Sequence, residues 1–502
     1  MRSITTPIDP DPCPQPFNMA RYVLDAGAAT PDKIALQVLR ATGAERWSYA
    51  RLRAAVRGTG TGLLRAGLAP GDRVLLRLGN TVDFPLAYLG AISVGVIPVP
   101  TSTQLTATEI TRIAQEINPA LILSAEGVAR PDHPARVLDA AALEAMRDLP
   151  ECDWTMGPPE RPAYMIYTSG SGGRPRAVVH AHRAIWARRM MWQGWYGLRA
   201  SDRLLHAGAF NWTYTLGTGL MDPWAIGATA LIPAEGAPIA LLMRRFEATI
   251  FAAAPGVYRQ LLKPGRPLDL PQLRHGLSAG EKLPDITRAA WEDATNRPIF
   301  EALGMSECST YISASPDRPA PPGTAGYPQA GRHIAILGAG GSPAPHGEGG
   351  ILAIHRSDPG LMLGYLDADA PALPLQGDWF LTGDRAVMAK DSAITYLGRD
   401  DDMMNSGGFR VSPLEIEETL ARHPEIRDIA CTEVSVREGV SIIAAFYTAS
   451  APISDTSLQE FADRHLARYK QPRHYQHCDT LPRGPNGKLL RRSLCARFEG
   501  AG

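Results

Sequence analysis

The stretch AYMIYTSGSGGRPRAVVHAH (residues 163–182) places a loop of glycines and hydroxyl side chains between two apolar segments. The first segment, residues 163–168, has the composition of a buried strand. Glycines let the backbone approach a ligand closely, and successive N–H groups form a concave anion-binding surface. The loop is not a Walker A loop, because GxxxxGK[ST] cannot be placed on it, and no GxGxxG pattern opens a helix. On these residues alone, a phosphate-binding loop and a solvated turn are both open interpretations.

Short apolar runs alternate with helix-period segments along much of the chain. The runs with the composition of buried strands are residues 72–78, 94–100, 120–125, 163–168, 203–208, 228–233 and 249–255. Between them, residues 48–66 and 107–116 have the pattern of helices. This alternation favours an α/β fold with largely parallel sheets.

One uncharged stretch, residues 84–108, is long enough to raise the question of a membrane segment. Prolines and glycines interrupt it, among them Pro98 and Pro100. We therefore expect a buried helix at 83–93 followed by a parallel strand at 94–99, and no membrane insertion.

The composition fits a large protein with more than one core. The chain has 502 residues, 45% of them hydrophobic, and Lys plus Arg equals Asp plus Glu at 51 each. Balanced charge gives no support for a nucleic-acid partner or an anionic-membrane surface. The six cysteines include no CxxC pair, which argues against a zinc site or a disulfide framework and favours free thiols. The N-terminus lacks the apolar segment of a secretory signal, so we expect a cytoplasmic protein.

The end of the chain has the pattern of a separate small unit. The segments SPLE (412–415) and SLQE (457–460) both match the capping box that starts a helix. Strands are expected near residues 427–435 and 441–448. The preceding segment YLGRDDDMMNSGG (396–408) is rich in turn-forming residues and is expected to act as a hinge.

Six blocks occur in the order in which the ANL superfamily of adenylate-forming enzymes carries them. They are YTSGSGGRPRAVVHAH (167–182), SAGEKLP (278–284), LGMSECS (303–309), GDWFLTGD (377–384), YLGRDDDMMNSGGFRVSPLEIE (396–417) and LPRGPNGK (481–488). The chain resembles this family over nearly its whole length. The resemblance implies a large α/β N-terminal AMP-binding domain, residues 1–400, with parallel-rich sheets flanked by helices and a β-barrel-like subdomain. It also implies a small mobile α+β domain, residues 401–502, that carries the catalytic lysine.

The resemblance implies a ligase that joins a carboxylic acid to ATP, giving acyl-AMP and pyrophosphate, and then transfers the acyl group to CoA. The carboxylate is its own nucleophile, so the protein has to align the reactants and offset their charge. The residues expected to cradle the β- and γ-phosphates are Thr168, Ser169, Gly170, Ser171, Gly172 and Gly173. Glu307 is the expected Mg²⁺ ligand, because a carboxylate suits that hard cation.

The resemblance also assigns the other nucleotide contacts. Asp384 and Arg399 are expected at the ribose. The residues expected along the adenine and the α-phosphate are Gly280, Glu281, Lys282, Leu303, Gly304, Met305 and Ser306.

The mobile domain is expected to supply groups to both reaction steps. Lys488 would bridge the carboxylate and the α-phosphate during adenylation and stabilise the developing charge. Asp401 occupies the hinge position. Gly408 would line the tunnel for the pantetheine of CoA, where a side chain would block the thiol. Lys470 and Arg473 would meet the nucleotide phosphates of CoA.

Four positions depart from the family pattern. Arg176 replaces the usual lysine, Gly172 a threonine and Ala177 a glycine. Arg176 keeps the charge but spreads it over a planar fork, so we expect phosphate binding and activity to persist. Leu303 replaces a common aromatic residue, which removes a stacking face for the nucleotide.

Residues 72–106 and 214–230 most resemble benzoate–CoA ligases. By position, the acyl pocket should be lined by Thr213, Tyr214, Gly304, Thr310 and Tyr311. Thr310 and Tyr311 stand where those enzymes carry a histidine and an aliphatic residue, and their hydroxyls need partners when buried. We expect a small aryl or short branched aliphatic acid as substrate. The alternative is that these aromatic residues belong to the core.

The segment ARYKQPR (467–473) resembles the tail of CoA ligases and favours CoA as the acceptor. Two other functions stay open: a stand-alone adenylation enzyme that loads an acyl carrier protein, and a degenerate ligand-binding protein without activity. The segment PRGPNGK (482–488) matches a pattern that acetyltransferases modify in this family, so an acetyltransferase and a deacetylase acting on Lys488 are expected partners. The sequence is compatible with a monomer or a homodimer.

Overall fold

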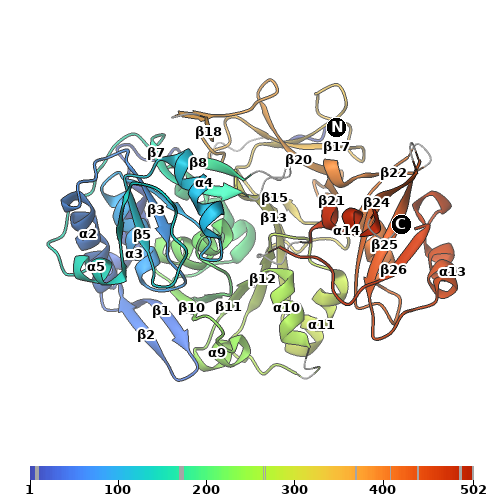
Figure 1. The fold of residues 1–502 in the computed structure, drawn as a ribbon, viewed down its shortest axis with the longest axis horizontal. Helices are drawn as coiled ribbons and strands as arrows, with labels where there is room; N and C mark the ends of the chain where they lie inside the picture. The colour runs from blue at the N-terminus through green and yellow to red at the C-terminus, as the bar shows by residue number, and fades with distance from the viewer. Residues whose placement is uncertain are drawn as a thin grey trace.

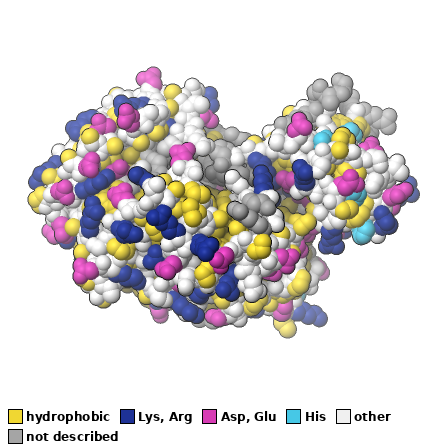
Figure 2. All heavy atoms as spheres, turned by 90° about the horizontal axis from the view of Figure 1, so that it is seen from below, with side chains coloured by type: hydrophobic (Ala, Val, Ile, Leu, Met, Phe, Trp, Pro, Cys, Tyr) yellow, Lys and Arg dark blue, Asp and Glu magenta, His cyan; other side chains and the backbone are white. Residues whose placement is uncertain are grey.

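The computed structural model describes residues 1–5, 11–168, 175–263, 265, 267–367, 370–406, 409–437, 440–484 and 489–499. A large N-terminal part, drawn from blue to orange, carries the sheets β1 to β21, and a smaller part, drawn in red, carries β22 to β26 (Figure 1). We call the second part, from β22 to α14, the small domain. Figure 2 shows it as a separate lobe beside the larger mass. Among the described residues no helix is long and apolar enough to cross a membrane.

A nine-stranded sheet forms the centre of the large part. Its order is β15–β14–β13–β12–β11–β9–β10–β1–β2. The six strands from β13 to β1 are parallel, and β14, β15 and β2 are antiparallel additions at the two edges. The strands are β1 (Ile34–Arg40), β2 (Gly43–Ser48), β9 (Arg203–His206), β10 (Thr229–Pro233), β11 (Ile250–Ala253), β12 (His275–Ala279), β13 (Ile299–Met305), β14 (Ser309–Ser313) and β15 (Tyr327–Pro328).

Two four-stranded sheets pack beside the central sheet. One is all parallel, in the order β4 (Ile97–Pro100), β3 (Arg73–Arg77), β5 (Leu121–Ser124) and β6 (Arg136–Leu138). The other is antiparallel, in the order β19 (Ala370–Ala372), β18 (Gly364–Asp367), β8 (Arg176–Ala181) and β7 (Pro162–Thr168). All seven predicted apolar runs are strands. The strand β7 departs from the expected parallel arrangement, because it pairs antiparallel with the next strand, β8, across a short connection.

The subdomain expected to be barrel-like is an antiparallel four-stranded sheet. Its order is β16 (Ile334–Leu337), β17 (Gly349–His355), β20 (Trp379–Met388) and β21 (Ile394–Arg399). Isolated bridges extend both edges, from Ile4 to Ala335 and from Gly326 to Ile394. Covering the edges in this way protects exposed strand backbone.

Helices cover the sheets of the large part. They are α1 (Met19–Asp25), α2 (Tyr49–Arg65), α3 (Asp83–Ser93), α4 (Ala107–Ile117), α5 (Ala140–Met146), α6 (Ala184–Ala187), α7 (Arg189–Met191), α8 (Asp222–Ala225), α9 (Ile239–Arg245), α10 (Pro255–Leu262) and α11 (Asp285–Thr295). Two π-helical segments are η2 (Trp192–Tyr196) and η3 (Thr215–Met221), and a 3₁₀ turn is η1 (Ala26–Ala29). Every residue of α3 after Asp83 is buried, which explains the uncharged stretch without a membrane.

The small domain has its own sheets and core. The strands are β22 (Met404–Ser406), β23 (Phe409–Val411), β24 (Asp428–Arg437), β25 (Val440–Thr448) and β26 (His474–His477). The helices are α12 (Pro413–Leu420), α13 (Asp455–His465) and α14 (Arg491–Glu499), with 3₁₀ turns η4 (Asp400–Asp402) and η5 (Arg468–Lys470). Its buried cluster includes Ile416, Leu420, Ile443 and Leu458.

Both predicted capping boxes of the small domain are wrong in their hydrogen bonds. Ser412 precedes α12, but its hydroxyl donates to the carbonyl oxygen of Leu397 and does not cap the helix. Helix α13 begins earlier than expected, and its N-cap is Ser454, which accepts from the backbone N–H of Ser457 at 3.2 Å. In the first case the serine hydroxyl bonds to a carbonyl oxygen outside the helix, and in the second case an earlier serine is the cap.

Candidate active site

The expected phosphate loop connects the two strands of an antiparallel hairpin. Thr168 ends β7 and lies opposite Arg176, which begins β8. Ser169, Gly170, Ser171, Gly172 and Gly173 lie outside the described residues. The hydroxyl oxygen of Thr168 is buried and has no hydrogen-bond partner in the part of the chain that the structure describes. Because a buried hydroxyl needs a partner, this donor fits a bound phosphate oxygen.

Glu307 stands on the turn between β13 and β14. Its side chain is buried, and its backbone carbonyl oxygen accepts from the N–H of Met362 at 2.8 Å. Its Oε1 accepts a hydrogen bond from the hydroxyl of Tyr365 at 2.7 Å. Burial, reinforced by Glu307, raises the pKa of Tyr365. The phenol therefore stays protonated and acts as the donor to the carboxylate.

The protein offers a potential metal ion one carboxylate at this place. Among the described residues, no group of three or more His, Cys, Asp or Glu side chains is positioned to hold a metal. Mg²⁺ usually takes one or two protein carboxylates and fills its other positions with water and substrate phosphates. The residues therefore fit a magnesium ion that arrives with a nucleotide.

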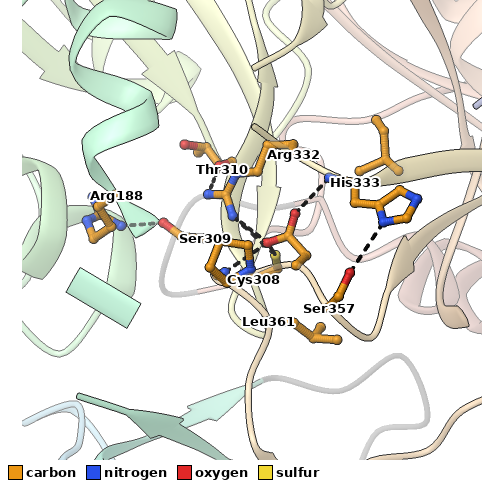
Figure 3. Close-up of polar contacts among 12 residues, drawn as sticks. Arg188, Cys308, Ser309, Thr310, Arg332, His333, Ser357 and Leu361 are labelled. Atoms are coloured by element: carbon orange, nitrogen blue, oxygen red, sulfur yellow. Dashed lines mark hydrogen bonds and ion pairs between the residues drawn. The ribbon is translucent and has the colours of Figure 1, made fainter. Parts of the chain in front are cut away.

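A buried ion pair braces the turn that carries Glu307. Nη1 of Arg332 lies 2.8 Å from Oδ1 of Asp358, and both side chains are fully buried. Nη2 of Arg332 donates to the carbonyl oxygen of Thr310 at 2.8 Å, and Oδ2 of Asp358 accepts from the backbone N–H of His333 at 3.1 Å (Figure 3). Burial raises the pKa of the Cys308 thiol, which faces Asp358, well above its usual range. The pair thus ties β14 to the segment that leads into β18.

A second buried ion pair reaches the same turn from another side. Nη2 of Arg188 lies 2.5 Å from Oδ2 of Asp222, and the hydroxyl of Tyr196 donates to that oxygen at 2.8 Å. Nη1 of Arg188 donates to Oγ of Ser309 (Figure 3). Burial alone would lower the pKa of Arg188, but Asp222 outweighs it and the pKa is raised. The turn is therefore held between two fixed arginines.

His180 fixes the backbone of Ser306. Its Nε2 lies 2.7 Å from the carbonyl oxygen of Ser306, and burial lowers its pKa to about 4. The ring is therefore neutral at pH 7 and donates through Nε2. A small cavity of about 10 Å³ lies beside these two residues and Thr213, with room for about one water.

The two residues expected at the ribose meet on neighbouring strands. Asp384 of β20 lies opposite Arg399 of β21, and Oδ1 of Asp384 is 3.3 Å from Nη1 of Arg399. The hydroxyl of Tyr396 donates to the same oxygen at 3.2 Å. Gly383 has a φ of 76°, and a Cβ there would lie 2.6 Å from the guanidinium of Arg399. Glycine at 383 is thus required for the close approach of Arg399.

The expected adenine segment lies at the end of β12 and contacts the small domain. Gly280 has a φ of 98°. Oε2 of Glu281 lies 3.3 Å from Nη1 of Arg483, and Lys282 forms an ion pair with Glu418 of α12. These contacts join the two domains next to the candidate nucleotide site.

Of the other residues expected to act from the small domain, one contacts the candidate ribose site and two lie elsewhere on that domain. Oδ1 of Asp401 lies 3.4 Å from Nε of Arg399, so the hinge carboxylate contacts the candidate ribose residue. Lys470 forms an ion pair with Glu415, and Arg473 is exposed. Gly408 and Lys488 lie outside the described residues.

The expected acyl pocket is only partly brought together. Tyr214 is buried, and its hydroxyl donates to the carbonyl oxygen of Leu277 at 3.1 Å. The ring of Trp212 lies 5.4 Å from that of Tyr214. A Cβ on Gly280 would lie 2.7 Å from the indole of Trp212. Trp212 therefore links the candidate acyl residues to the candidate adenine segment.

Tyr311 does not join this pocket. It is a neighbour of Thr310 on β14, and successive strand residues point to opposite faces. Tyr311 packs in the core cluster of the antiparallel sheet, with Leu303 and Met305 against its edge. Tyr214 belongs to a different cluster. Burial, followed by the charges of Asp384 and more weakly Glu307, raises the pKa of Tyr311 well above its usual range.

Comparison with known proteins identifies the family. A family model described as AMP-binding enzyme matches residues 24–366, and one described as AMP-binding enzyme C-terminal domain matches residues 415–488. The chain belongs to the AMP-binding enzyme family. A benzoate–CoA ligase of Thauera aromatica is 28% identical over 94% of this chain and 92% of that protein.

Solved structures of the family have the same fold. The anthranilate CoA ligase AuaEII, in complex with anthranoyl-AMP, superposes with a TM-score of 0.88 at 24% identity, covering 98% of this chain and 99% of that chain. A benzoate CoA ligase from Burkholderia xenovorans LB400 superposes with a TM-score of 0.84 at 25% identity, covering 95% of this chain and 100% of that chain. The α/β fold with a smaller C-terminal domain is thereby confirmed.

Sequence reasoning missed three residues of this site. Tyr365 contacts Glu307, His180 holds Ser306 and Trp212 packs on Gly280. His180 lies in the quoted hairpin, where its place in an apolar strand was the available signal. Tyr365 gave no local signal, because it reaches Glu307 only through the pairing of β18 with β8, two segments far apart in the sequence.

Proposed function

We infer that this AMP-binding enzyme is an ATP-dependent carboxylate–CoA ligase of the AMP-forming type. The observation that carries this inference is the match to both family domains, joined to a full-length match to a benzoate–CoA ligase. The buried carboxylates of Glu307 and Asp384 support the inference, because the resemblance assigns them to the phosphate and ribose ends of ATP. An acyl-carrier-loading enzyme is the less favoured alternative.

The residues fit a reaction driven by alignment. The substrate carboxylate attacks the α-phosphate directly, so no general base is needed. Thr168 and Glu307 would hold the phosphate end, and Asp384 would accept hydrogen bonds from the two ribose hydroxyls. Mg²⁺, when bound at Glu307, would neutralise phosphate charge. Lys488 would stabilise the charge that develops between the carboxylate and the α-phosphate.

The proposed substrate is a small aryl or short branched aliphatic acid. Trp212 and His206 both pack against Tyr214, with ring centroids 4.4 Å apart for His206 and Tyr214, and these rings would form aromatic walls of the proposed pocket. Residues 1–400 and 401–502 are the proposed domains, and rotation about Asp401 would exchange the adenylation and thioester states.

Lys488 is also a proposed site of acetylation, which would remove its charge. Mass spectrometry that finds only unmodified Lys488 in cells would contradict this proposed modification.

The decisive experiment measures AMP release from ATP and Mg²⁺ with a panel of acids, each with and without CoA. The panel runs from acetate and isobutyrate through benzoate and hydroxybenzoates to octanoate and palmitate. CoA-dependent AMP release with one group of small acids is the expected result. Little AMP release with any acid, whether or not CoA is present, would favour the carrier-loading alternative, in which AMP is released only with the carrier protein. Preference for palmitate would overturn the proposed pocket. No turnover by folded protein would overturn the ligase assignment.

A further inference from the structure

Arg176 makes two contacts with one residue, Tyr365. The guanidinium carbon lies 3.7 Å from the centre of the Tyr365 ring, and Nη2 donates to the Tyr365 hydroxyl at 2.9 Å. A stacked guanidinium gains from the negative face of the ring. Arg176 is exposed, and no other partner is recorded for it among the described residues. Its remaining N–H groups are thus available to a ligand.

The strand pairing explains how these side chains meet. On β18, Tyr365 lies directly opposite Val178 of β8. Arg176 is two residues before Val178, so it shares a face with Val178 and is the diagonal neighbour of Tyr365. Diagonal neighbours across antiparallel strands are within reach when both side chains are long. The first residue of β8 and the ring on β18 are therefore fixed together by the sheet.

The hydroxyl of Tyr365 forms hydrogen bonds with both Arg176 and Glu307 and so connects them. It has one hydrogen, which it donates to Oε1 of Glu307 at 2.7 Å, and it accepts from Arg176 at 2.9 Å. Hydrogen bonds in such a chain polarise and strengthen one another. The result is a continuous path from the end of the phosphate loop, through a phenol, to the candidate metal-binding carboxylate.

We propose that Tyr365 is a positioning residue that, together with Arg176, orients the Glu307 carboxylate for Mg²⁺–ATP. The proposal rests on the proposed role of Glu307. Partners of a metal-binding side chain fix its direction, and their loss typically weakens metal binding about 10–100-fold. Arg176 is then more than a substitute for a lysine, because an ammonium cannot lie flat on the ring and also donate to the hydroxyl in the same way. Replacing Arg176 by the residue usual in the family would weaken the site.

The test compares wild type with Tyr365→Phe, Arg176→Lys and the double variant. Binding of ATP is titrated by calorimetry at several Mg²⁺ concentrations without acid, and AMP release is measured over the same Mg²⁺ range with a turned-over acid. We expect Tyr365→Phe to raise the Mg²⁺ concentration for half-saturation about 10-fold or more, with little change in kcat at saturating Mg²⁺. The double variant should lose less than the product of the two single losses, because the residues act as one chain.

A matched pair elsewhere provides the control. The guanidinium carbon of Arg318 lies 3.4 Å from the ring centre of Tyr327, and no contact of this pair with Glu307 is recorded in the described part of the chain. Tyr327→Phe and Arg318→Lys should leave the Mg²⁺ dependence unchanged. An unchanged Mg²⁺ dependence in Tyr365→Phe, or an equal change in the control, would overturn the proposal. If wild type turns over no acid, the proposed function fails, while the ATP titrations still decide the role of Tyr365.

Discussion

Arg483 of the small domain contacts Glu281 of the large part, with Nη1 and Oε2 3.3 Å apart, while its Nη2 lies 2.9 Å from Asp428 within its own domain. Arg483 stands five residues before Lys488, in the segment expected to reach the α-phosphate. Lys282 and Glu418 form a second contact between the same surfaces. The two ion pairs therefore stabilise an orientation in which the end of the chain faces the candidate nucleotide site.

Weakening this contact should slow adenylation more than thioester formation. The side chains of Arg483 and Glu281 are partly exposed, so the pair is worth at most about 1 kcal/mol, or about fivefold in population. We expect Arg483→Ala and Glu281→Gln each to lower acid-dependent pyrophosphate exchange about two- to fivefold. The reaction of synthetic acyl-AMP with CoA should be unchanged. Arg427→Ala is the control, because its recorded contact is with Ser450 inside the small domain. Equal losses in both half-reactions would contradict the prediction.

Lys488 should matter for one half-reaction only. Removing an electrostatic group that acts in the transition state typically costs about 10²–10³ in rate. We expect Lys488→Ala to lower pyrophosphate exchange by about that factor while the reaction of synthetic acyl-AMP with CoA continues. Lys470→Ala is the comparison. Lys470, which forms an ion pair with Glu415, is expected to meet the nucleotide phosphates of CoA, so its loss should affect the KM for CoA without slowing adenylation. An unchanged exchange rate in Lys488→Ala would remove the role assigned to this lysine.

Local sequence patterns predicted the secondary structure elements that depend on the composition of a short segment. The apolar runs became strands, and the uncharged stretch after Asp83 became the buried helix α3 and the strand β4. The order of the motif blocks was enough to expect Asp384 and Arg399 in one site, where β20 and β21 place them side by side.

The local sequence patterns missed residues whose positions depend on contacts between segments far apart in the sequence. Ser412 looks like a helix cap, yet its hydroxyl bonds to Leu397, because a tertiary partner competes with the local one. Position in a motif put Tyr311 in the acyl pocket, but the alternation of β14 turns it into the core cluster of the antiparallel sheet. Tyr365 belongs to the site only because β18 pairs with β8.

The buried pair of Arg332 and Asp358 should dominate the stability of this region. Removing one partner leaves an uncompensated buried charge, which typically costs about 3–5 kcal/mol. We expect Asp358→Asn to lower the unfolding midpoint in guanidinium clearly and to raise the KM for ATP, because the pair braces the turn of Glu307. The exposed pair Arg356–Asp378, 3.7 Å apart, is the control, and Asp378→Asn should cost less than about 1 kcal/mol. Equal midpoints for the two variants would contradict the prediction.

Buried neutral histidines should make the protein sensitive to mild acid. Burial lowers the pKa of His206 to about 3 from 6.5, and neither ring nitrogen has a partner among the described residues. The unfolded chain therefore binds a proton more readily than the folded one, and unfolding is favoured as the pH falls. The stabilisation is complete above about pH 6.5 and is lost progressively toward pH 3. At pH 5 this one residue should cost about 2 kcal/mol relative to pH 8.

His206→Phe tests this contribution through its pH slope. The larger ring is expected to disturb packing against Tyr214 by a similar amount at every pH, whereas the acid-dependent loss should disappear. The free energy of unfolding is measured in urea at pH 8, 6 and 5, for the variant and for wild type. We expect the difference between pH 8 and pH 5 to shrink by about 2 kcal/mol in His206→Phe. The control is His465→Phe, because His465 is exposed at the end of α13. This variant should keep the wild-type dependence of the unfolding free energy on pH. Parallel slopes for wild type and His206→Phe would show that this histidine does not carry the acid sensitivity.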